Sequence, residues 1–437
     1  MTRFESRRPD WLSVGEALRR ILARAEPLET ESLPLGAALG RALAQAVHAP
    51  WTLPPWDNAA MDGYAVRSRD LAGASRTNPA LLRVVGETSA GGGPGPGISN
   101  REAVRIMTGA PLPPGADAVV RVEDTDAEDL PGEVRVFSPS DTGRHIRPRG
   151  EDILEGEVLL REGATLGPGQ VGLLAAAGVD RVSAHRLPRV GILATGDELE
   201  APGDFARVLA GRALPESNSP TLAAAVILAG GLPVPLGIAR DTPHSILEKL
   251  EEGRREGVDV LVTSGGASMG EKDLLKRVME EAGFRLDFWR VKMRPGTPFS
   301  FGHLPPGPGG RPLPVFGLPG NPASSFVTFQ VLGRPFVRRL AGHLRAHGPV
   351  LTARAGEILE SSVGMTHFLR VVLRPGPSWN GVFLAGPQGS GLVRAQALCH
   401  GLAVIPEGTD RVPEGGTVRV LLLDDFGSGS PDTEYLS

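Results

Sequence analysis

The sequence predicts a multidomain α/β plus β protein. We expect a central three-layer α/β domain with a mostly parallel sheet, a β-rich inserted domain, a helical N-terminal domain and a C-terminal β-barrel-like domain. Apolar strands and helical segments alternate from about Pro188 onwards, and such alternation predicts a parallel sheet covered on both faces. Short apolar runs separated by Gly, Pro and Asp predict the β-rich parts.

Four strands, each followed by a helix, are expected in the central domain. The strands are expected at residues 190–194, 234–238, 258–262 and 315–318, and the helices at 219–229, 243–252, 272–282 and 323–340. Ligands in such sheets bind at the carboxyl ends of the strands. The loops after these strands are therefore the first candidates for a site.

The N-terminal region begins with a predicted helix at residues 14–25. Ser13 and Glu16 form a capping box there, and apolar residues follow at helical spacing. A second helix is expected at 35–46, although it contains two glycines. The chain later returns to a strand and helix pattern, with a helix at 171–177, which makes the β-rich part between them an insertion.

Short apolar runs of the β-rich type occur in two places. They lie at residues 81–85, 103–107, 118–122 and 133–137, and again at 369–373, 382–384, 402–405 and 418–422. The expected domains are 1–48 with 147–185 (discontinuous N-terminal domain), 49–146 (β-rich insertion), 186–345 (α/β domain), 346–425 (C-terminal β domain) and 426–437 (loose tail).

Composition excludes several classes of protein. The 437 residues carry a net charge of −4, which gives no indication of a nucleic-acid partner. The one cysteine, Cys399, excludes an intrachain disulfide and a zinc site built from several cysteines. The start shows no apolar run of signal-peptide length, and the most apolar stretch, 221–239, is interrupted by Gly and Pro. We therefore expect a cytoplasmic protein that does not bind a membrane.

Residues 259–273, DVLVTSGGASMGEKD, are the most informative stretch. They predict a buried strand, a turn of small residues and a helix that begins near Glu271. Such a turn exposes backbone N–H groups that attract anions, and Gly265 and Gly266 let the backbone approach a ligand closely. Asp273 adds a carboxylate, which suggests a phosphorylated ligand with a metal. A plain connection in which Asp273 complements the helix dipole is an equal alternative.

Acidic residues also follow two other strands of the central domain. Asp197 and Glu198 lie in ATGDEL after the first strand, and Asp241 follows the second. Parallel strands place these acids on one sheet edge with Asp273, where a metal or basic residues must balance their charge. The alternative is a set of solvated loop acids that cap helices.

Basic residues and another glycine-containing turn come later in the same domain. Arg290, Lys292 and Arg294 alternate in FWRVKMRPGTP, so we expect one strand to point all three to the same face. The last strand ends in GLPGNPASS (317–325), whose Gly and Pro content predicts a tight turn at the same sheet edge.

Six ordered motifs resemble those of a known family. They are PWDNAAMDGYAVR (55–67), RIMTGAPLPPGADAVV (105–120), RPRGEDI (147–153), ATGDEL (194–199), TSGGASMGEKD (263–273) and GLPGNPASS (317–325). Together they resemble the molybdopterin molybdenumtransferases, molybdenum insertases related to the E domain of gephyrin. The resemblance covers nearly the whole chain.

The resemblance implies a transferase of molybdenum cofactor biosynthesis. The family forms homodimers of elongated four-domain subunits, with the active site between the third domain and the second domain of the partner subunit. With a divalent metal, usually Mg²⁺, its members cleave adenylylated molybdopterin, insert molybdenum from molybdate and release AMP. Molybdopterin adenylyltransferase and molybdoenzyme-maturation proteins are the further partners that it implies. Two alternatives stay open: a molybdopterin adenylyltransferase, and a non-catalytic, gephyrin-like scaffold.

The resemblance also implies functional residues. The catalytic set is Asp62, Thr108, Glu198, Asp241 and Asp273, and the metal candidates among them are Asp241, Asp273 and Glu198. The substrate-binding residues that it implies are Ser264, Gly265, Gly266, Ser268, Pro319, Gly320 and Asn321. Molybdate, a tetrahedral dianion, also needs hydroxyl and cationic donors, and our candidates for these are Arg290, Arg294, Thr297 and Ser325. Arg290, Arg294 and Thr297 stand where lysines are usual in the family, and only Thr297 loses the charge.

Two further patterns are interpreted as structural. His343 and His347 are four residues apart near the end of a predicted helix, and we expect a cationic last turn that complements the helix dipole. A metal-binding pair is the alternative. QGSG (388–391) is interpreted as a turn that shapes the last domain.

Overall fold

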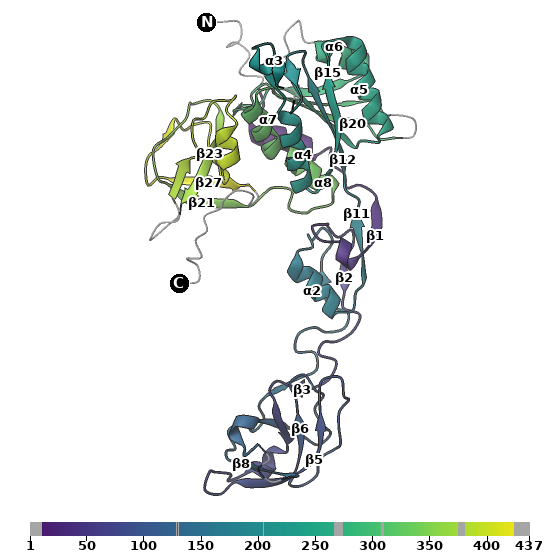
Figure 1. The fold of residues 1–437 in the computed structure, drawn as a ribbon, viewed down its shortest axis with the longest axis vertical. Coiled ribbons are helices and arrows are strands. Elements are labelled where there is room, and N and C mark those ends of the chain that lie inside the picture. Colours follow the sequence, from purple (N-terminus) through teal and green to yellow (C-terminus); the bar gives the residue numbers. More distant parts are fainter. Residues whose placement is uncertain are drawn as a thin grey trace.

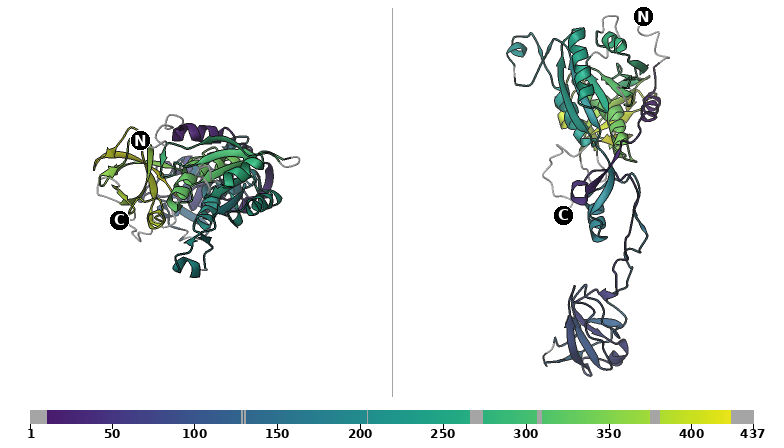
Figure 2. Two further views of the ribbon diagram at one scale, coloured as in Figure 1. Left: turned by 90° about the horizontal axis from the view of Figure 1, so that it is seen from above. Right: turned by 90° about the vertical axis from the view of Figure 1, so that its right-hand side faces the viewer.

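The computed structural model describes residues 11–127, 129, 131–203, 205–265, 274–306, 310–374 and 381–423. They form an elongated molecule (Figures 1 and 2). An α/β domain and a C-terminal barrel lie at one end, a slender stalk of paired strands follows, and a β-rich domain forms the far end. This architecture confirms the predicted fold class. The expected loose tail, 426–437, lies outside the described residues.

A six-stranded sheet forms the centre of the α/β domain, in the order β15-β12-β16-β20-β19-β17. Its strands are β12 (Arg189–Thr195), β15 (Leu232–Ala239), β16 (Val260–Ser264), β17 (Arg285–Trp289), β19 (Ser300–Leu304) and β20 (Leu313–Leu318). β15, β12, β16 and β20 are parallel neighbours, whereas β19 runs antiparallel to β20 and to β17. The four parallel strands are the four that the sequence predicts, so their carboxyl ends share one edge.

Helices cover both faces of this sheet, because successive residues of its central strands are apolar. The helices are α4 (Asn218–Leu228), α5 (Pro243–Arg255), α6 (Leu274–Glu281), α7 (Pro322–Thr328) and α8 (Arg334–Leu340), with a π-helical turn, Phe329–Gly333, between the last two. Ile192 packs with α4, α7 and α8, whereas the next residue, Leu193, packs with α5 and α6 on the other face. Within the described ranges, no helix has the length and apolar composition needed to cross a membrane.

The segment after β17 differs from the continuous strand expected for Arg290, Lys292 and Arg294. β17 ends at Trp289, Arg290 adopts a left-handed φ of 69°, and strand β18 contains only Met293–Arg294. β18 pairs with a strand of the C-terminal barrel, so this segment connects the two domains. A turn at Arg290 interrupts the strand expected there, so the three basic residues do not lie on one strand. Their spacing of two in the sequence gives no sign of this turn.

Helix α1 (Val14–Leu22) confirms the first predicted helix. Ser13 caps it by accepting a hydrogen bond from Glu16 N at 3.2 Å. Its buried residues Ala17 and Ile21 belong to the core of the α/β domain, where the helix packs against α8. The first helix of the chain therefore stabilises the central domain.

The second predicted helix, residues 35–46, is wrong. Only a 3-10 turn, Leu35–Ala37, forms there. Gly40 adopts a φ of +77°, a conformation that an α-helix does not contain.

The stalk consists of chain segments that run outwards and return. β1 (Thr30–Pro34) pairs antiparallel with β11 (Arg181–His185), β2 (Val47–His48) with β10 (Val158–Leu160), and β3 (Asn58–Ala59) with β9 (Ile146–Arg147). Helix α2 (Pro168–Ala176), which confirms the helix expected at 171–177, packs beside β10. The β-rich domain lies between the outgoing and the returning segments.

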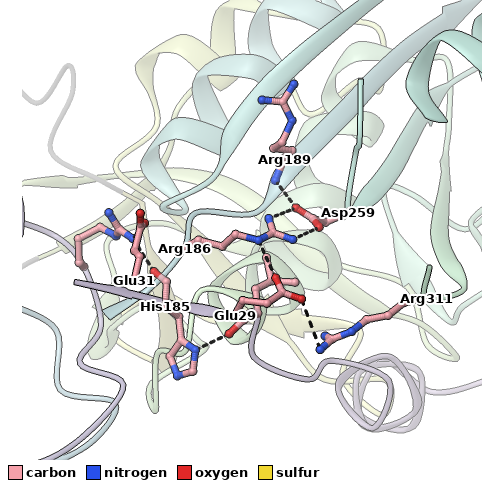
Figure 3. Close-up of polar contacts among 9 residues, drawn as sticks. Glu29, Glu31, His185, Arg186, Arg189, Asp259 and Arg311 are labelled. Atoms are coloured by element: carbon pink, nitrogen blue, oxygen red, sulfur yellow. Dashed lines mark hydrogen bonds and ion pairs between the residues drawn. The ribbon is translucent and has the colours of Figure 1, made fainter. Parts of the chain in front are cut away.

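An ion-pair cluster connects the stalk to the α/β domain (Figure 3). Arg186, just after β11, donates to the two carboxylate oxygens of Asp259 at 2.7 and 2.6 Å and to Glu29 at 2.7 Å. Hydrogen bonds to Asp259 raise the pKa of Arg186. Asp259 also accepts the backbone N–H of Arg189, the first residue of β12, at 2.8 Å. This bidentate pair attaches the segment between β11 and β12 to the residue that precedes β16.

The β-rich domain contains a five-stranded sheet in the order β7-β4-β6-β5-β8. Its strands are β4 (Gly63–Val66), β5 (Ala80–Thr88), β6 (Glu102–Ile106), β7 (Ala118–Arg121) and β8 (Glu133–Val136). The four predicted apolar runs are confirmed as β5 to β8. β4, which was not predicted, lies between β6 and β7 and is fully buried.

The C-terminal domain is a closed five-stranded barrel, which confirms the expected barrel-like domain. Its strands are β21 (Val350–Ala355), β23 (Thr366–Arg374), β24 (Gly381–Leu384), β25 (Gly401–Ile405) and β27 (Thr417–Leu422). The pairing of β23 with β25 closes the ring. Smaller elements are β22 (Leu359–Glu360), β26 (Arg411–Val412) and helix α9 (Arg394–Leu398).

Candidate functional site

The candidate site lies at the edge of the central sheet where the four parallel strands end. The chain continues into loops at Gly196 after β12, at Arg240 after β15, at Gly265 after β16 and at Pro319 after β20. These loops meet because the four strands are neighbours in the sheet. The edge faces away from the stalk (Figure 1).

Asp197 and Asp241 fix each other's loops. Asp241 N donates to Asp197 Oδ1 at 3.2 Å, and Asp197 N donates to Asp241 Oδ2 at 3.4 Å. Arg240 donates to the carbonyl oxygens of Asp197 and Leu199 at 3.3 and 3.4 Å. Each of the two carboxylates uses one oxygen in this pair of bonds. The other oxygen accepts no hydrogen bond from the described residues, and Asp197 and Asp241 are both exposed.

The three predicted metal ligands are only partly placed. The Glu198 carboxylate folds back over Gly196 so closely that a Cβ there would collide with it. Asp241 lies in the adjacent loop, whereas Asp273 lies outside the described residues. In the described part of the chain, no three His, Cys, Asp or Glu side chains form a metal-binding group. Two exposed carboxylates nevertheless fit Mg²⁺, which binds one or two carboxylates together with substrate phosphates.

The predicted anion-binding turn begins directly after β16. Ser264 is 2% exposed, and Gly265 has a φ of +97°. A Cβ on Gly265 would lie 2.8 Å from the carbonyl oxygen of Thr195, so glycine is required at this position. Gly266 and Ser268 lie outside the described residues, so the anion nest itself stays a prediction.

The turn after β20 connects the α/β domain to the barrel. Asn321, which precedes α7, donates from Nδ2 to Ser390 Oγ at 3.1 Å. Gly320 lies beside the glycine turn, where its Cβ position would be 3.6 Å from Gly265 Cα. Ser325 in α7 is buried, and its Oγ has no hydrogen-bond partner among the described residues. This turn therefore brings a hydroxyl of the barrel, that of Ser390, to the sheet edge.

Arg290 is held between aromatic rings. Its guanidinium carbon lies 4.0 Å from the centroid of a Trp289 ring and 5.1 Å from that of Trp11. The N-terminal segment thus packs against Arg290 through Trp11.

Arg294 and Thr297 have different surroundings from Arg290. Arg294 is exposed and lies beside His367, whose pKa is lowered by burial and by the charge of Arg294. Thr297 Oγ1 donates to Met293 O at 2.7 Å, so its proton is used inside its own loop. Arg294 therefore offers a positive charge, whereas Thr297 stabilises the loop.

A second cluster lies in the β-rich domain. Asp62 precedes β4 and Thr108 follows β6, and the antiparallel pairing of these strands brings them together. Asp62 Oδ1 accepts hydrogen bonds from Thr108 N at 2.7 Å and from Thr108 Oγ1 at 2.8 Å. These bonds lower the pKa of Asp62, and the charge of Arg105 adds to the effect. The result is an exposed, ionised carboxylate with a fixed direction.

The two clusters are far apart within one chain. The β-rich domain lies beyond the stalk, at the opposite end of the molecule from the carboxyl edge of the central sheet (Figures 1 and 2). Asp62 and Thr108 therefore do not meet Glu198 and Asp241 within one subunit.

Two residues that contact the site loops were not predicted. Asn218, the first residue of α4, donates from Nδ2 to Ser264 Oγ at 2.6 Å and to Gly320 O at 2.7 Å. It follows a small excursion made of β13 (Leu199–Glu200), α3 (Ala206–Leu209) and β14 (Leu214–Pro215). The other is Ser390, which bonds Asn321. It is part of QGSG (388–391), a motif that we interpreted from the sequence as purely structural. No local signal marks Asn218.

Three family models match consecutive parts of the chain. They are the MoeA N-terminal region (domain I and II) at residues 12–178, a probable molybdopterin binding domain at 191–339, and the MoeA C-terminal region (domain IV) at 352–423. The fold and these matches define a protein of the MoeA class.

Relatives extend over almost the whole chain. The molybdopterin molybdenumtransferase of Bacillus subtilis (strain 168) is 34% identical over 425 residues, which cover 96% of this chain and 95% of that protein. Molybdopterin molybdenumtransferase 2 of Mycobacterium tuberculosis is 35% identical over 413 residues, 93% of this chain and 98% of its own. A crystal structure of the molybdopterin biosynthesis moeA protein from Pyrococcus horikoshii has a TM-score of 0.80 at 28% identity, covering 94% of this chain and 100% of that one. The chain belongs to the molybdopterin molybdenumtransferase family.

Proposed function

We propose that the protein inserts molybdenum from molybdate into adenylylated molybdopterin and releases AMP, as a metal-dependent transferase of molybdenum cofactor biosynthesis. The main support is that Asp241, Glu198 and the turn at Gly265 converge on one sheet edge in a chain that matches the family over nearly its full length. Cleavage of a phosphoanhydride requires that the charge on two phosphates be neutralised. Backbone N–H groups and carboxylates that hold a metal supply that neutralisation.

The carboxylates at the sheet edge would hold the metal, for which we propose Mg²⁺. Asp241 and Glu198, together with Asp273, are the proposed ligands, and the bound ion would neutralise the phosphate charge. Asp197 supports this role because it fixes the backbone of Asp241. Gly265 supports it because, without a Cβ, the turn after β16 packs directly against Thr195 at the end of β12, which keeps the two loops together.

Molybdate is a tetrahedral dianion and requires a pocket of hydrogen-bond donors. Arg294 is exposed beside the turn that carries Thr297, and the buried Ser325 hydroxyl has no partner among the described residues. We propose that these two contact the oxyanion, with Asn321 bordering the pocket and Arg290 adding positive charge. Thr297 would shape the pocket without donating to it, because its proton is bound to Met293 O.

The complete active site is proposed to form between two copies of the chain. Asp62 and Thr108 cannot reach the sheet edge of their own subunit, because the stalk separates them from it (Figure 1). The β-rich domain of a second subunit that runs in the opposite direction can reach that edge. Asp62 would then orient a water molecule at the ligand. We further propose that this homodimer is cytoplasmic and meets molybdopterin adenylyltransferase and molybdoenzyme-maturation proteins.

The proposal is tested by incubating the purified protein with adenylylated molybdopterin, molybdate and Mg²⁺. AMP should be released, and chelation of the metal should stop the release. Asp241→Ala should change the melting temperature little, since the residue is exposed and its carboxylate accepts only the long bond of 3.4 Å from Asp197 N among the described residues. It should slow AMP release about 100-fold or more. The matched control is Glu251→Ala, an exposed acid on α5, which should behave like the wild type. Normal turnover by Asp241→Ala would contradict the metal assignment.

Two measurements separate the alternatives. Pyrophosphate formed from ATP and molybdopterin would favour a molybdopterin adenylyltransferase. Failure to restore molybdoenzyme activity in a molybdenum-insertase-deficient strain would favour a scaffold.

A further inference from the structure

Asn218 is a buried polar residue that joins the two turns of the proposed site. It is 9% exposed and occupies the first position of α4. Its amide nitrogen bonds Ser264 at the end of β16 and Gly320 in the turn after β20. One side chain thus holds together two loops that come from different parts of the sequence.

Asn218 does not cap its own helix. Asn at a helix start usually satisfies free backbone N–H groups, but here the buried carboxylate of Glu216 accepts the N–H of Ser219 at 2.8 Å. Glu216 N in turn donates to Glu200 O at 2.8 Å, which fixes the segment before the helix. The Asn218 amide is therefore directed to the site loops.

The contact with Gly320 fixes the orientation of the Asn218 amide. A backbone carbonyl oxygen only accepts hydrogen bonds, so the amide nitrogen and not Oδ1 must face Gly320 O. The second hydrogen of the same nitrogen then points to Ser264 Oγ. Ser264 is the acceptor in this pair, and its own hydroxyl proton must be directed elsewhere.

The bond from Asn218 does not use the hydroxyl proton of Ser264. Across the described ranges, no acceptor takes a hydrogen bond from Ser264 Oγ. The turn predicted to bind an anion begins at the next residue, Gly265, and an anionic oxygen is a strong partner for a hydroxyl. We infer that Asn218 is a positioning residue that keeps Ser264 as a hydrogen-bond donor to a phosphate oxygen of the substrate. This inference rests on the proposed function, which supplies the phosphorylated substrate.

A double-mutant cycle on the full-length protein tests the inference. Asn218→Ala and Ser264→Ala are each expected to raise the Kd for AMP and the KM for AMP release about tenfold, the effect of one hydrogen bond to a charged group, with kcat changed much less. Because Asn218 acts through Ser264, the double variant should lose no more than the single Ser264→Ala variant. Additive losses of about 100-fold would overturn the inference.

Asn218→Asp provides a second test that preserves the shape of the side chain. A carboxylate only accepts, so Ser264 would donate to it and withdraw its proton from the ligand. The loss of AMP affinity should exceed tenfold and should be clearly smaller when Ser264→Ala is also present, since only the added charge and the lost bond to Gly320 O then act. If Asn218→Ala lowers the melting temperature strongly, the test of the positioning role rests on Asn218→Asp alone. The matched control, Asn100→Asp, changes an exposed asparagine of the β-rich domain and should leave Kd and KM unchanged.

The outcomes distinguish this inference from the proposed function. A wild-type protein that binds AMP but does not release AMP from adenylylated molybdopterin would contradict the proposed reaction. The double-mutant cycle, measured on the Kd for AMP, would still test the role of Asn218. A wild-type protein that binds no AMP would overturn both. Unchanged AMP affinity in Asn218→Ala and Asn218→Asp would overturn the positioning role.

Discussion

Thr108 lowers the pKa of one candidate catalytic residue, Asp62. Its two hydrogen bonds hold the pKa of Asp62 below the ordinary value. Thr108→Val keeps only the backbone bond, so the pKa should rise, and the acidic limb of the pH profile of AMP release should move to higher pH. Thr108→Ser retains the hydroxyl and should leave the limb in place. An unchanged limb in Thr108→Val would show that the ionisation of Asp62 does not limit the rate.

His343 behaves differently from the cationic helix end that the sequence predicts, and that prediction is wrong. The residue is 2% exposed, and its Nδ1 lies 2.7 Å from Thr165 Oγ1 in a hydrogen bond to the stalk side of the molecule. Burial, with the charges of Arg338 and Arg41, lowers the pKa of His343 to about 4. The imidazole is therefore neutral at pH 7.

The neutral state of His343 makes folding stability depend on pH. The unfolded chain takes up the proton below about pH 6.5, whereas the folded protein does so only near pH 4, so stability is lost as the pH falls through this window. Between pH 6.5 and 5 the loss should be about 2 kcal/mol. His343→Gln removes this contribution, so its free energy of unfolding in denaturant should fall less over the same range. Parallel pH dependences of the two proteins would contradict the assignment.

Single residues of the site were predictable where their chemistry is local. Gly265 is the first residue after β16 and Asp241 the second after β15, and a parallel sheet brings such positions to one edge. Asn218 and Ser390 were missed because their partners in the site loops are 46 to 102 residues away along the chain. Contacts of this kind depend on the packing of helices and domains, which a single sequence does not reveal.

At the scale of elements, the turn after β16 depends on the absence of a side chain at Gly265. A Cβ there meets Thr195 O at 2.8 Å, whereas Gly257, also with a positive φ, has no atom within 4 Å of its Cβ position. Gly265→Ala should therefore lower the free energy of unfolding by about 2–3 kcal/mol, and Gly257→Ala by about 1 kcal/mol. Denaturant unfolding measures both. Equal losses would show that the turn can move to accept a methyl group.

Elements with a regular period were predicted well. The four parallel strands and the helices after them are confirmed, because apolar residues recur there at helical or strand spacing over several turns. The helix expected at 35–46 failed because glycine conformation decided that segment. The strand expected through Arg290 and Arg294 failed because alternation in the sequence continued across a turn. Local backbone geometry therefore sets the limit of such predictions.

At the scale of the whole molecule, the distance between Asp62 and Asp241 predicts the behaviour of mixed dimers. Consider a dimer in which one subunit carries Asp62→Ala and the other Asp241→Ala. If each site is shared between subunits, one site contains both changes and the other contains neither. Such a dimer, isolated with two different affinity tags, should release AMP at about half the wild-type rate, whereas both homodimeric variants should be almost inactive.

The mixed dimer can also contradict the claim that each active site is shared between two subunits. If each site were built from a single chain, every site in it would carry one change and the dimer would be inactive. A wild-type protein that light scattering shows to be monomeric while it turns over would equally exclude a shared site.

β3 and β9, which lead into and out of the β-rich domain, pair with each other through Asn58–Arg147 and Ala59–Ile146. The two ends of a ninety-residue excursion are therefore neighbours in space. Exchange of the β-rich domain for that of a relative therefore requires only two peptide junctions, and these lie side by side at β3 and β9. Natural variation can thus replace the module that supplies Asp62 without disturbing the sheet that supplies Asp241.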